Sequence, residues 1–110
     1  MIIDKNGNIS VITQEKASPI ELVKKIQALY PKFKHDNIIV SLTALAPIST
    51  EEIAEFIEIS NLHKASKHSF VLVSNKVDLD TLPDQLDVVP TLQEAYDIIE
   101  MEDIERDLGF

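Results

Sequence analysis

The chain alternates between short apolar runs and longer segments in which apolar residues recur every three or four positions. Residues 37–42 (NIIVSL) and 70–74 (FVLVS) are rich in β-branched and other apolar residues, which is typical of strands covered on both faces. Residues 87–90 (DVVP) predict a shorter strand. Strands and helices alternate after an initial hairpin, in the predicted order ββαβαβαβα. This pattern indicates an α/β fold with a mostly parallel mixed sheet.

The predicted hairpin covers residues 1–13, where Asn6-Gly7 separates two apolar segments and suits the positive φ values of a type I′ turn. Three predicted helices begin with a hydroxyl residue followed three positions later by glutamate, as in a capping box: Ser18 with Glu21, Ser49 with Glu52, and Thr91 with Glu94. Pro31 is expected to end the first helix near Tyr30. The second helix is expected from about Thr50 to Lys67, and residues 77–86 predict a loop with one or two helical turns.

The second helix has two contrasting faces on a helical wheel. Ile53, Phe56 and Ile57 share the face expected to pack on the sheet. The other side carries two apolar residues among carboxylates: Glu55, Glu58, Ile59 and Leu62. Two interpretations stay open for this side. Its apolar residues pack under a neighbouring loop or helix, or they form a partner-binding ridge with an acidic rim.

The last helix changes its apolar face along its length. Leu92, Ala95, Tyr96 and Ile99 lie on one side, and the next position on that side is Asp103, which is not expected to be fully buried without a partner. Another apolar stripe, on nearly the opposite side, contains Met101, Ile104 and Leu108. We expect either a bend near Glu100 or a second apolar edge.

Composition narrows the class of protein. The 110 residues fit a single domain, and 45% of them are apolar, which is enough for a core. The absence of cysteine excludes disulfides and thiolate chemistry. The N-terminal residues lack the features of a signal peptide, and no apolar run is long enough to span a membrane. We therefore expect a soluble cytoplasmic protein with no membrane partner.

The acidic charge is concentrated at one end. The net charge is −9, and residues 78–110 hold eleven acids and one arginine. This balance argues against a nucleic-acid partner, because phosphate contacts need clustered lysine and arginine. The acidic third either maintains solubility as a solvated face or recruits a basic partner surface.

A resemblance to a known family covers roughly the whole chain. Residues 87–100 (DVVPTLQEAYDIIE) are similar to the last strand and helix of the STAS domain, the family of bacterial anti-sigma-factor antagonists and of the cytoplasmic ends of sulfate transporters. In residues 42–56 (LTALAPISTEEIAEF), Ser49 and Thr50 match the hydroxyl position of the family's phosphorylation loop, whereas its Asp and Gly are absent.

The resemblance implies a non-enzymatic bacterial regulatory module that binds a protein partner, such as an anti-sigma or kinase-like regulator, and is a monomer in isolation. It marks Ser49 and Thr50 as possible phosphorylation sites. The capping box explains Ser49 without phosphorylation, and the neighbouring Glu51 and Glu52 would repel a phosphate. The alternative function is a small-ligand or nucleotide-binding module, or the regulatory companion of an enzyme.

Residues 75–78 (NKVD) resemble the guanine-specificity motif of GTP-binding proteins. A GTPase also needs a glycine-rich phosphate loop, and neither Gly7 nor Gly109 begins one. The four residues are more simply a turn after a strand, because Asn and Asp favour turns. We expect no tight guanine-nucleotide binding, although a weak nucleotide site stays open.

No catalytic, cofactor or metal residues are expected. His63 and His68 are five positions apart and would not share a helical face. Asp78, Asp80 and Asp84 lack the Gly and Glu of an EF-hand, whose positions hold Pro83 and Val89. Similar short bacterial chains are sometimes called ribonuclease Z, but that enzyme's H-x-H-x-D-H cluster is absent. No serine lies in a G-x-S-x-G motif.

Overall fold

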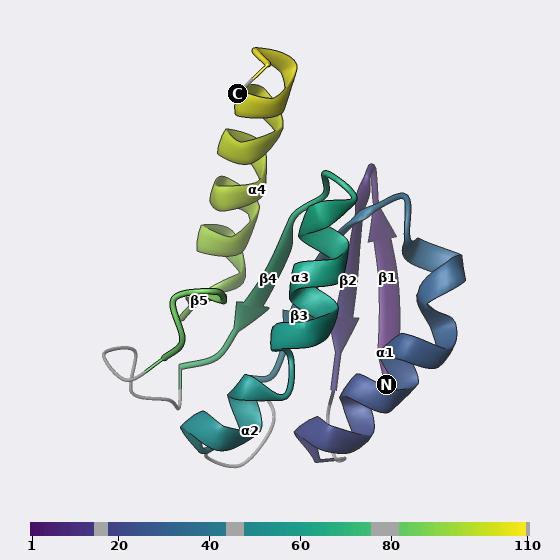
Figure 1. The fold of residues 1–110 in the computed structure, drawn as a ribbon, viewed down its shortest axis with the longest axis vertical. Helices are drawn as coiled ribbons and strands as arrows, with labels where there is room; N and C mark the ends of the chain where they lie inside the picture. The colour runs from purple at the N-terminus through teal and green to yellow at the C-terminus, as the bar shows by residue number, and fades with distance from the viewer. Residues whose placement is uncertain (15–17, 44–47, 76–81, 110) are drawn as a thin grey trace.

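A single five-stranded sheet forms the centre of the molecule. The structure is a computed structural model that describes residues 1–14, 18–43, 48–75 and 82–109. The strands follow one another across the sheet in sequence order (Figure 1): β1 (Ile2–Asn6), β2 (Ile9–Thr13), β3 (Asn37–Ser41), β4 (Phe70–Val73) and β5 (Asp87–Val89). β1 is antiparallel to β2, and the other neighbouring pairs are parallel. The predicted α/β fold with a mostly parallel mixed sheet is confirmed.

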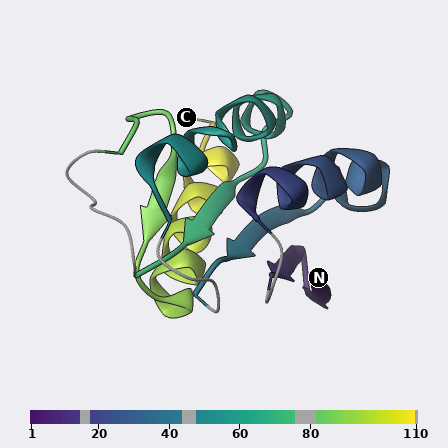
Figure 2. The same cartoon turned by 90° about the horizontal axis from the view of Figure 1, so that it is seen from below.

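Helices cover both faces of the sheet. They are α1 (Pro19–Phe33), α2 (Thr50–Ala54), α3 (Ile57–Ala65) and α4 (Leu92–Asp107). Side chains of α1, α2 and α3 share one hydrophobic cluster with Ile38 and Val40 of β3, whereas α4 shares a second cluster with Ile39. Successive strand residues point to opposite faces, so β3 contributes to both clusters. Figure 2 shows α1, α2 and α3 together on one side of the sheet.

The hairpin has a different turn from the one predicted. Asn6 is still in β1, where it pairs with Ile9, so the turn residues are Gly7 and Asn8. Gly7 has a φ of 64°. The φ of Asn8 is not positive, because Lys67 is the one described non-glycine residue with a positive φ. A glycine with positive φ at the first turn position is typical of a type II′ turn, not of type I′.

Two helices depart from their predicted bounds. α1 continues through Pro31 to Phe33, because burial of the Phe33 side chain in the core outweighs the backbone hydrogen bond that proline cannot donate. The helix predicted from Thr50 to Lys67 is divided into α2 and α3 by a turn at Glu55 and Phe56. Residues 82–86 form bends and a turn, and the rest of the loop predicted there lies outside the described residues.

The predicted N-caps are present. The hydroxyls of Ser18 and Thr91 accept hydrogen bonds from the backbone N–H of Glu21 and Glu94. At Ser49 both halves of the capping box are formed. These side chains satisfy backbone donors that the first turn of a helix leaves free, which explains where α1, α2 and α4 begin.

Candidate functional site

The predicted partner-binding residues lie along α3 and the turn before it. Glu55 and Glu58 are exposed, and the Leu62 residue is 56% exposed. Glu58 and Leu62 are four positions apart, so they occupy neighbouring places on one helical face. The expectation that Ile59 belongs to this exposed ridge is wrong, because Ile59 is only 2% exposed and packs in the main core.

The error over Ile59 has a physical cause. The buried side of α3 is centred on Ile59, Ser60 and His63, and two of these residues are polar. A hydrophobicity pattern therefore gives a wrong orientation for the helix. The turn at Glu55 and Phe56 adds to the error, because it interrupts the single helical wheel on which the expectation depended.

A groove lies beside Leu62, between the C-terminal ends of α1 and α3. Its volume is about 390 Å³, and Leu62 and the Tyr30 ring give it apolar surface. The remaining lining residues are Lys34, His35, Ser66 and His68. Single exposed apolar residues are common on protein surfaces, so Leu62 is of interest here only together with the groove beside it.

Beneath this groove, His63 is completely buried and hydrogen-bonded on both sides. Its Nε2 lies 2.7 Å from the backbone oxygen of Asp36, and its Nδ1 lies 2.7 Å from the Tyr30 hydroxyl. Because a carbonyl oxygen only accepts, Nε2 carries the hydrogen and Nδ1 accepts from Tyr30. Burial lowers the pKa of His63, since the charged imidazole loses its hydration, and the nearby His68 and Arg106 lower it further.

The hydrogen bond to the Asp36 carbonyl and the negative charge of Asp36 both raise the pKa of His63. Burial has the larger effect, so the pKa is lowered overall. The rings of His63 and His68 stack with their centroids 5.2 Å apart, although their spacing in the sequence gave no sign of this contact. Within the described ranges, no three His, Asp or Glu side chains are arranged to hold a metal ion.

The possible phosphorylation residues lie at the start of α2, as expected from the capping box. The exposed Ser49 accepts a hydrogen bond from the Glu52 N–H at 3.1 Å and donates one to Glu52 Oε1 at 3.2 Å. Thr50 is half-buried. The Ser49 hydroxyl therefore already has a structural role in the capping box.

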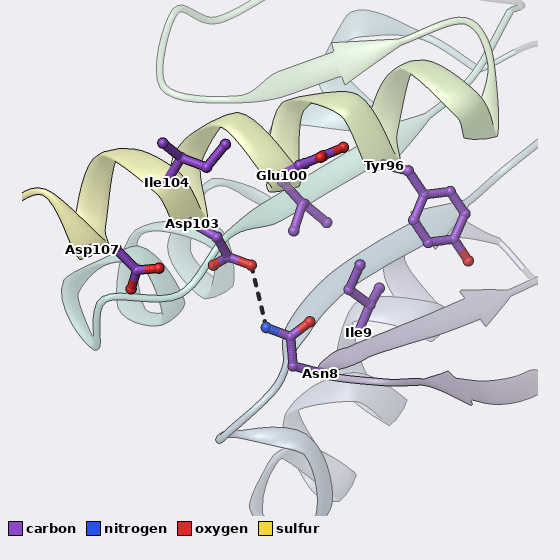
Figure 3. A pocket seen from close by; sticks show the side chains of 8 residues that line it. Asn8, Ile9, Tyr96, Glu100, Asp103, Ile104 and Asp107 are labelled. Atoms are coloured by element: carbon purple, nitrogen blue, oxygen red, sulfur yellow. Dashed lines mark hydrogen bonds between the residues drawn. The ribbon is translucent and has the colours of Figure 1, made fainter.

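A second groove separates α4 from the β1–β2 turn, as Figure 3 shows. It has a volume of about 350 Å³. Eight residues line it: Asn8, Ile9, Tyr96, Ile99, Glu100, Asp103, Ile104 and Asp107. Of the two expected alternatives, a bend near Glu100 or a second apolar edge, the first finds no support in an interrupted helix, because α4 is continuous from Leu92 to Asp107. The other alternative is observed, because Met101, Ile104 and Leu108 are all more than half exposed.

Asp103 is the centre of a polar network at this groove. Its carboxylate forms an ion pair with Arg106 and accepts hydrogen bonds from the side-chain amides of Asn8 and Asn37. Burial alone would raise the pKa of Asp103, but the hydrogen bonds from Arg106, Asn8 and Asn37 lower it overall. As expected, Asp103 is not fully buried, and the sequence gave no indication of the partners that hold its carboxylate.

Two further expectations meet the limits of the described residues. Of the NKVD motif, Asn75 is described as an exposed residue after β4, whereas Lys76, Val77 and Asp78 lie outside. Asp80 of the possible calcium loop lies outside as well. In the part of the chain that the structure describes, no helix is long and apolar enough to cross a membrane.

Comparison with known proteins identifies the fold. No family model matches the chain, and no curated protein matches it. A solved structure described as "Molecular architecture of the stressosome, a signal integration and transduction hub" matches with a TM-score of 0.60 and 19% sequence identity. The match covers 91% of this chain and 96% of that chain. The protein therefore has a STAS-like fold.

Proposed function

We propose that the protein is a non-enzymatic interaction module in a regulatory signalling pathway, similar in role to an anti-sigma-factor antagonist. The supporting observation is the fold similarity to a chain of the stressosome, described as a signal integration and transduction hub. The similarity extends over nearly all of both chains, so the whole domain corresponds rather than one motif. An anti-sigma or kinase-like regulator is the class of partner that this role requires.

We place the partner-binding surface at Glu55, Glu58 and Leu62, together with the neighbouring groove. Leu62 supplies exposed apolar area, and the groove beside it offers space for a partner's side chain. The exposed Glu58 lies one helical turn before Leu62, and the exposed Glu55 lies in the turn before α3, whereas Lys34 lines the groove itself. Such an arrangement fits an apolar anchor on the partner with lysine or arginine on the side that meets Glu55 and Glu58, because apolar centres supply affinity and charged rims supply specificity.

The test compares partner recovery by tagged variants in native cells. Leu62→Asp should abolish recovery of the specific partner, as measured by cross-linking and quantitative mass spectrometry. Met101→Asp is a matched control, because Met101 is 54% exposed, close to the 56% of Leu62, and lies on α4 outside both grooves. Both variants should keep the thermal midpoint of the wild type, since neither changes a buried side chain.

A partner that is recovered equally with wild type and both variants would place the interface elsewhere. A partner that is lost with both variants would point to a general effect of added negative charge. The proposed surface requires that recovery fails with Leu62→Asp and persists with Met101→Asp.

Ser49 and Thr50 are the positions at which we propose regulatory phosphorylation. A phosphate on Ser49 would remove the hydrogen that the hydroxyl donates to Glu52 and would add negative charge beside Glu51 and Glu52. The contact between Ser49 and the Glu52 carboxylate would be replaced by repulsion at the start of α2, close to the proposed surface at Glu55. Mass spectrometry of the protein from native cells should detect the phosphopeptide, and unmodified peptide under all growth conditions would contradict regulation at these residues.

A further inference from the structure

The groove between α4 and the β1–β2 turn combines an apolar base with an acidic border. Ile9 is partly buried and Ile99 is buried, and both belong to the cluster under α4. Ile104, which is 54% exposed, adds apolar surface. Four lining residues at helical spacing follow one face of α4, and the last three bring carboxylates to the border: Tyr96, Glu100, Asp103 and Asp107.

The carboxylates of this border differ in their partners. Asp103 is held by Arg106, Asn8 and Asn37. Glu100 and Asp107 are exposed, and no lysine, arginine or histidine of the described residues forms an ion pair with either. Figure 3 shows the bond between Asp103 and Asn8 across the groove, with Tyr96 on one side of it and Asp107 on the other. Two carboxylates that no cation of the described ranges pairs with therefore lie next to apolar surface.

Lysine and arginine side chains match this combination chemically. Their aliphatic stems pack on apolar surface while their cationic ends reach carboxylates. A cation at this site could also approach the ring of Tyr96. An acidic side chain would be repelled by the carboxylates of the groove. A neutral polar side chain would neither pair with these carboxylates nor pack on the apolar surface.

The charge of the chain indicates whether a second copy of the chain or a different protein occupies this groove. Each copy has a net charge of −9, and residues 78–110, which include α4, contribute −10 of it. Two copies would therefore repel one another near this groove. A basic segment of another protein has the opposite charge and would be attracted.

We propose that the groove between α4 and the β1–β2 turn binds a basic, partly apolar segment of a second protein, with lysine or arginine side chains at Glu100 and Asp107. This surface is separate from the one around Leu62, because the two lie against helices on opposite faces of the sheet. The chain would then have two docking surfaces and could connect two proteins.

The experiment uses the purified full chain and a short fluorescein-labelled peptide in which lysine and leucine alternate. Binding is measured by fluorescence anisotropy at about 0.15 M salt, where exposed charges are screened as in the cell. The double variant Glu100→Gln, Asp107→Asn should weaken binding about tenfold, because it removes two ion pairs. Both replacements keep the side-chain shape, and neither residue takes part in the Asp103 network.

A matched control removes two charges from the opposite side of α4. Glu94 and Glu105 are exposed and lie roughly half a turn away from Asp103 on a helical wheel. Glu94→Gln, Glu105→Gln changes the net charge by the same amount and should weaken binding less than about twofold. Peptides in which lysine alternates with serine, or glutamate with leucine, test the apolar and the cationic contributions separately.

Equal loss of binding in both double variants would overturn the site, because the chain would then attract cations by its overall charge. Unchanged binding in the Glu100 and Asp107 variant would overturn it as well. A concentration-dependent dimer in sedimentation velocity that this double variant dissociates would assign the groove to a second copy and refute the basic partner. None of these measurements depends on the surface around Leu62. A result that refutes the groove at α4 therefore leaves the proposed surface around Leu62 untouched, and the reverse also holds.

Discussion

Replacing His63 by alanine should destabilise the protein strongly, although the residue is polar. The imidazole is completely buried and makes hydrogen bonds of 2.7 Å to the Tyr30 hydroxyl and to the Asp36 backbone oxygen. Its ring also packs edge to face with Phe70, at a centroid distance of 6.4 Å. The substitution removes all of these contacts and leaves a cavity.

The size of the effect follows from these contacts. Each lost hydrogen bond costs about 1 kcal/mol, and a buried Asp36 carbonyl left without this donor costs about 1–3 kcal/mol more. These terms alone sum to about 3–5 kcal/mol, and the lost ring packing adds to that cost. Domains of this size are stable by only about 5–15 kcal/mol, so the variant should be close to unfolding at moderate denaturant concentration.

The assay is urea unfolding followed by far-ultraviolet circular dichroism. Tyr30→Phe isolates one hydrogen bond and should cost about 1 kcal/mol. His68→Ala is the matched control, because His68 stacks on His63 but is partly exposed, and it should cost no more than about 1 kcal/mol. If His63→Ala shifts the midpoint no more than His68→Ala does, the buried network does not stabilise the fold.

The same residue predicts how stability depends on pH. Burial lowers the pKa of His63 below its ordinary value of 6.5, so below about pH 6.5 the unfolded chain binds more protons than the folded one. The contribution of His63 is therefore complete above that pH and declines as the pH falls toward the lowered folded pKa. Urea midpoints at about pH 7.5 and 5.5 should differ more for wild type than for His63→Gln. Equal differences would contradict this pKa shift.

Four further substitutions test the orientation of α3, the backbone conformation at its end and the cap of α2. Ile59→Ala should cost about 2–5 kcal/mol, because Ile59 is core, whereas Leu62→Ala should change stability by less than about 0.5 kcal/mol; similar urea midpoints for the two variants would contradict the orientation of α3. Lys67→Gly should stabilise by about 1 kcal/mol, because glycine adopts the φ of 67° at the end of α3 without strain, and an unchanged thermal midpoint would argue against that conformation. Ser49→Ala should cost about 0.5–2 kcal/mol by removing the acceptor for Glu52 N–H, as chemical denaturation would measure, and no cost would show that this cap is weak.

Local sequence patterns were sufficient to locate the central strands along the chain and most helix starts. The apolar runs that include Asn37–Ser41 and Phe70–Val73 predicted two central strands, because a strand covered on both faces needs continuous apolar residues. Ser18, Ser49 and Thr91 predicted the helix starts, because an N-cap depends on residues only three positions apart.

Local patterns were insufficient where distant segments determine a residue's surroundings. Pro31 does not end α1, because the burial of Phe33 holds the last turn. Ile59 is buried and Leu62 exposed because α3 orients His63 toward Tyr30 and Asp36, which are 33 and 27 residues away along the chain. A pattern that counts polar residues as exposed cannot identify a histidine whose hydrogen-bonding groups are satisfied inside the core.

The two grooves likewise exist only in the tertiary structure. The sequence alone determined that the last third of the chain is acidic and that its apolar stripe shifts at Met101. The docking of α4 beside the β1–β2 turn decided that Asp103 pairs with Asn37, 66 residues away, and that Glu100 and Asp107 keep their charges without a cation among the described residues. Sequence fixes the charge of a helix, but the neighbours that neutralise each carboxylate depend on how the helix packs against the sheet.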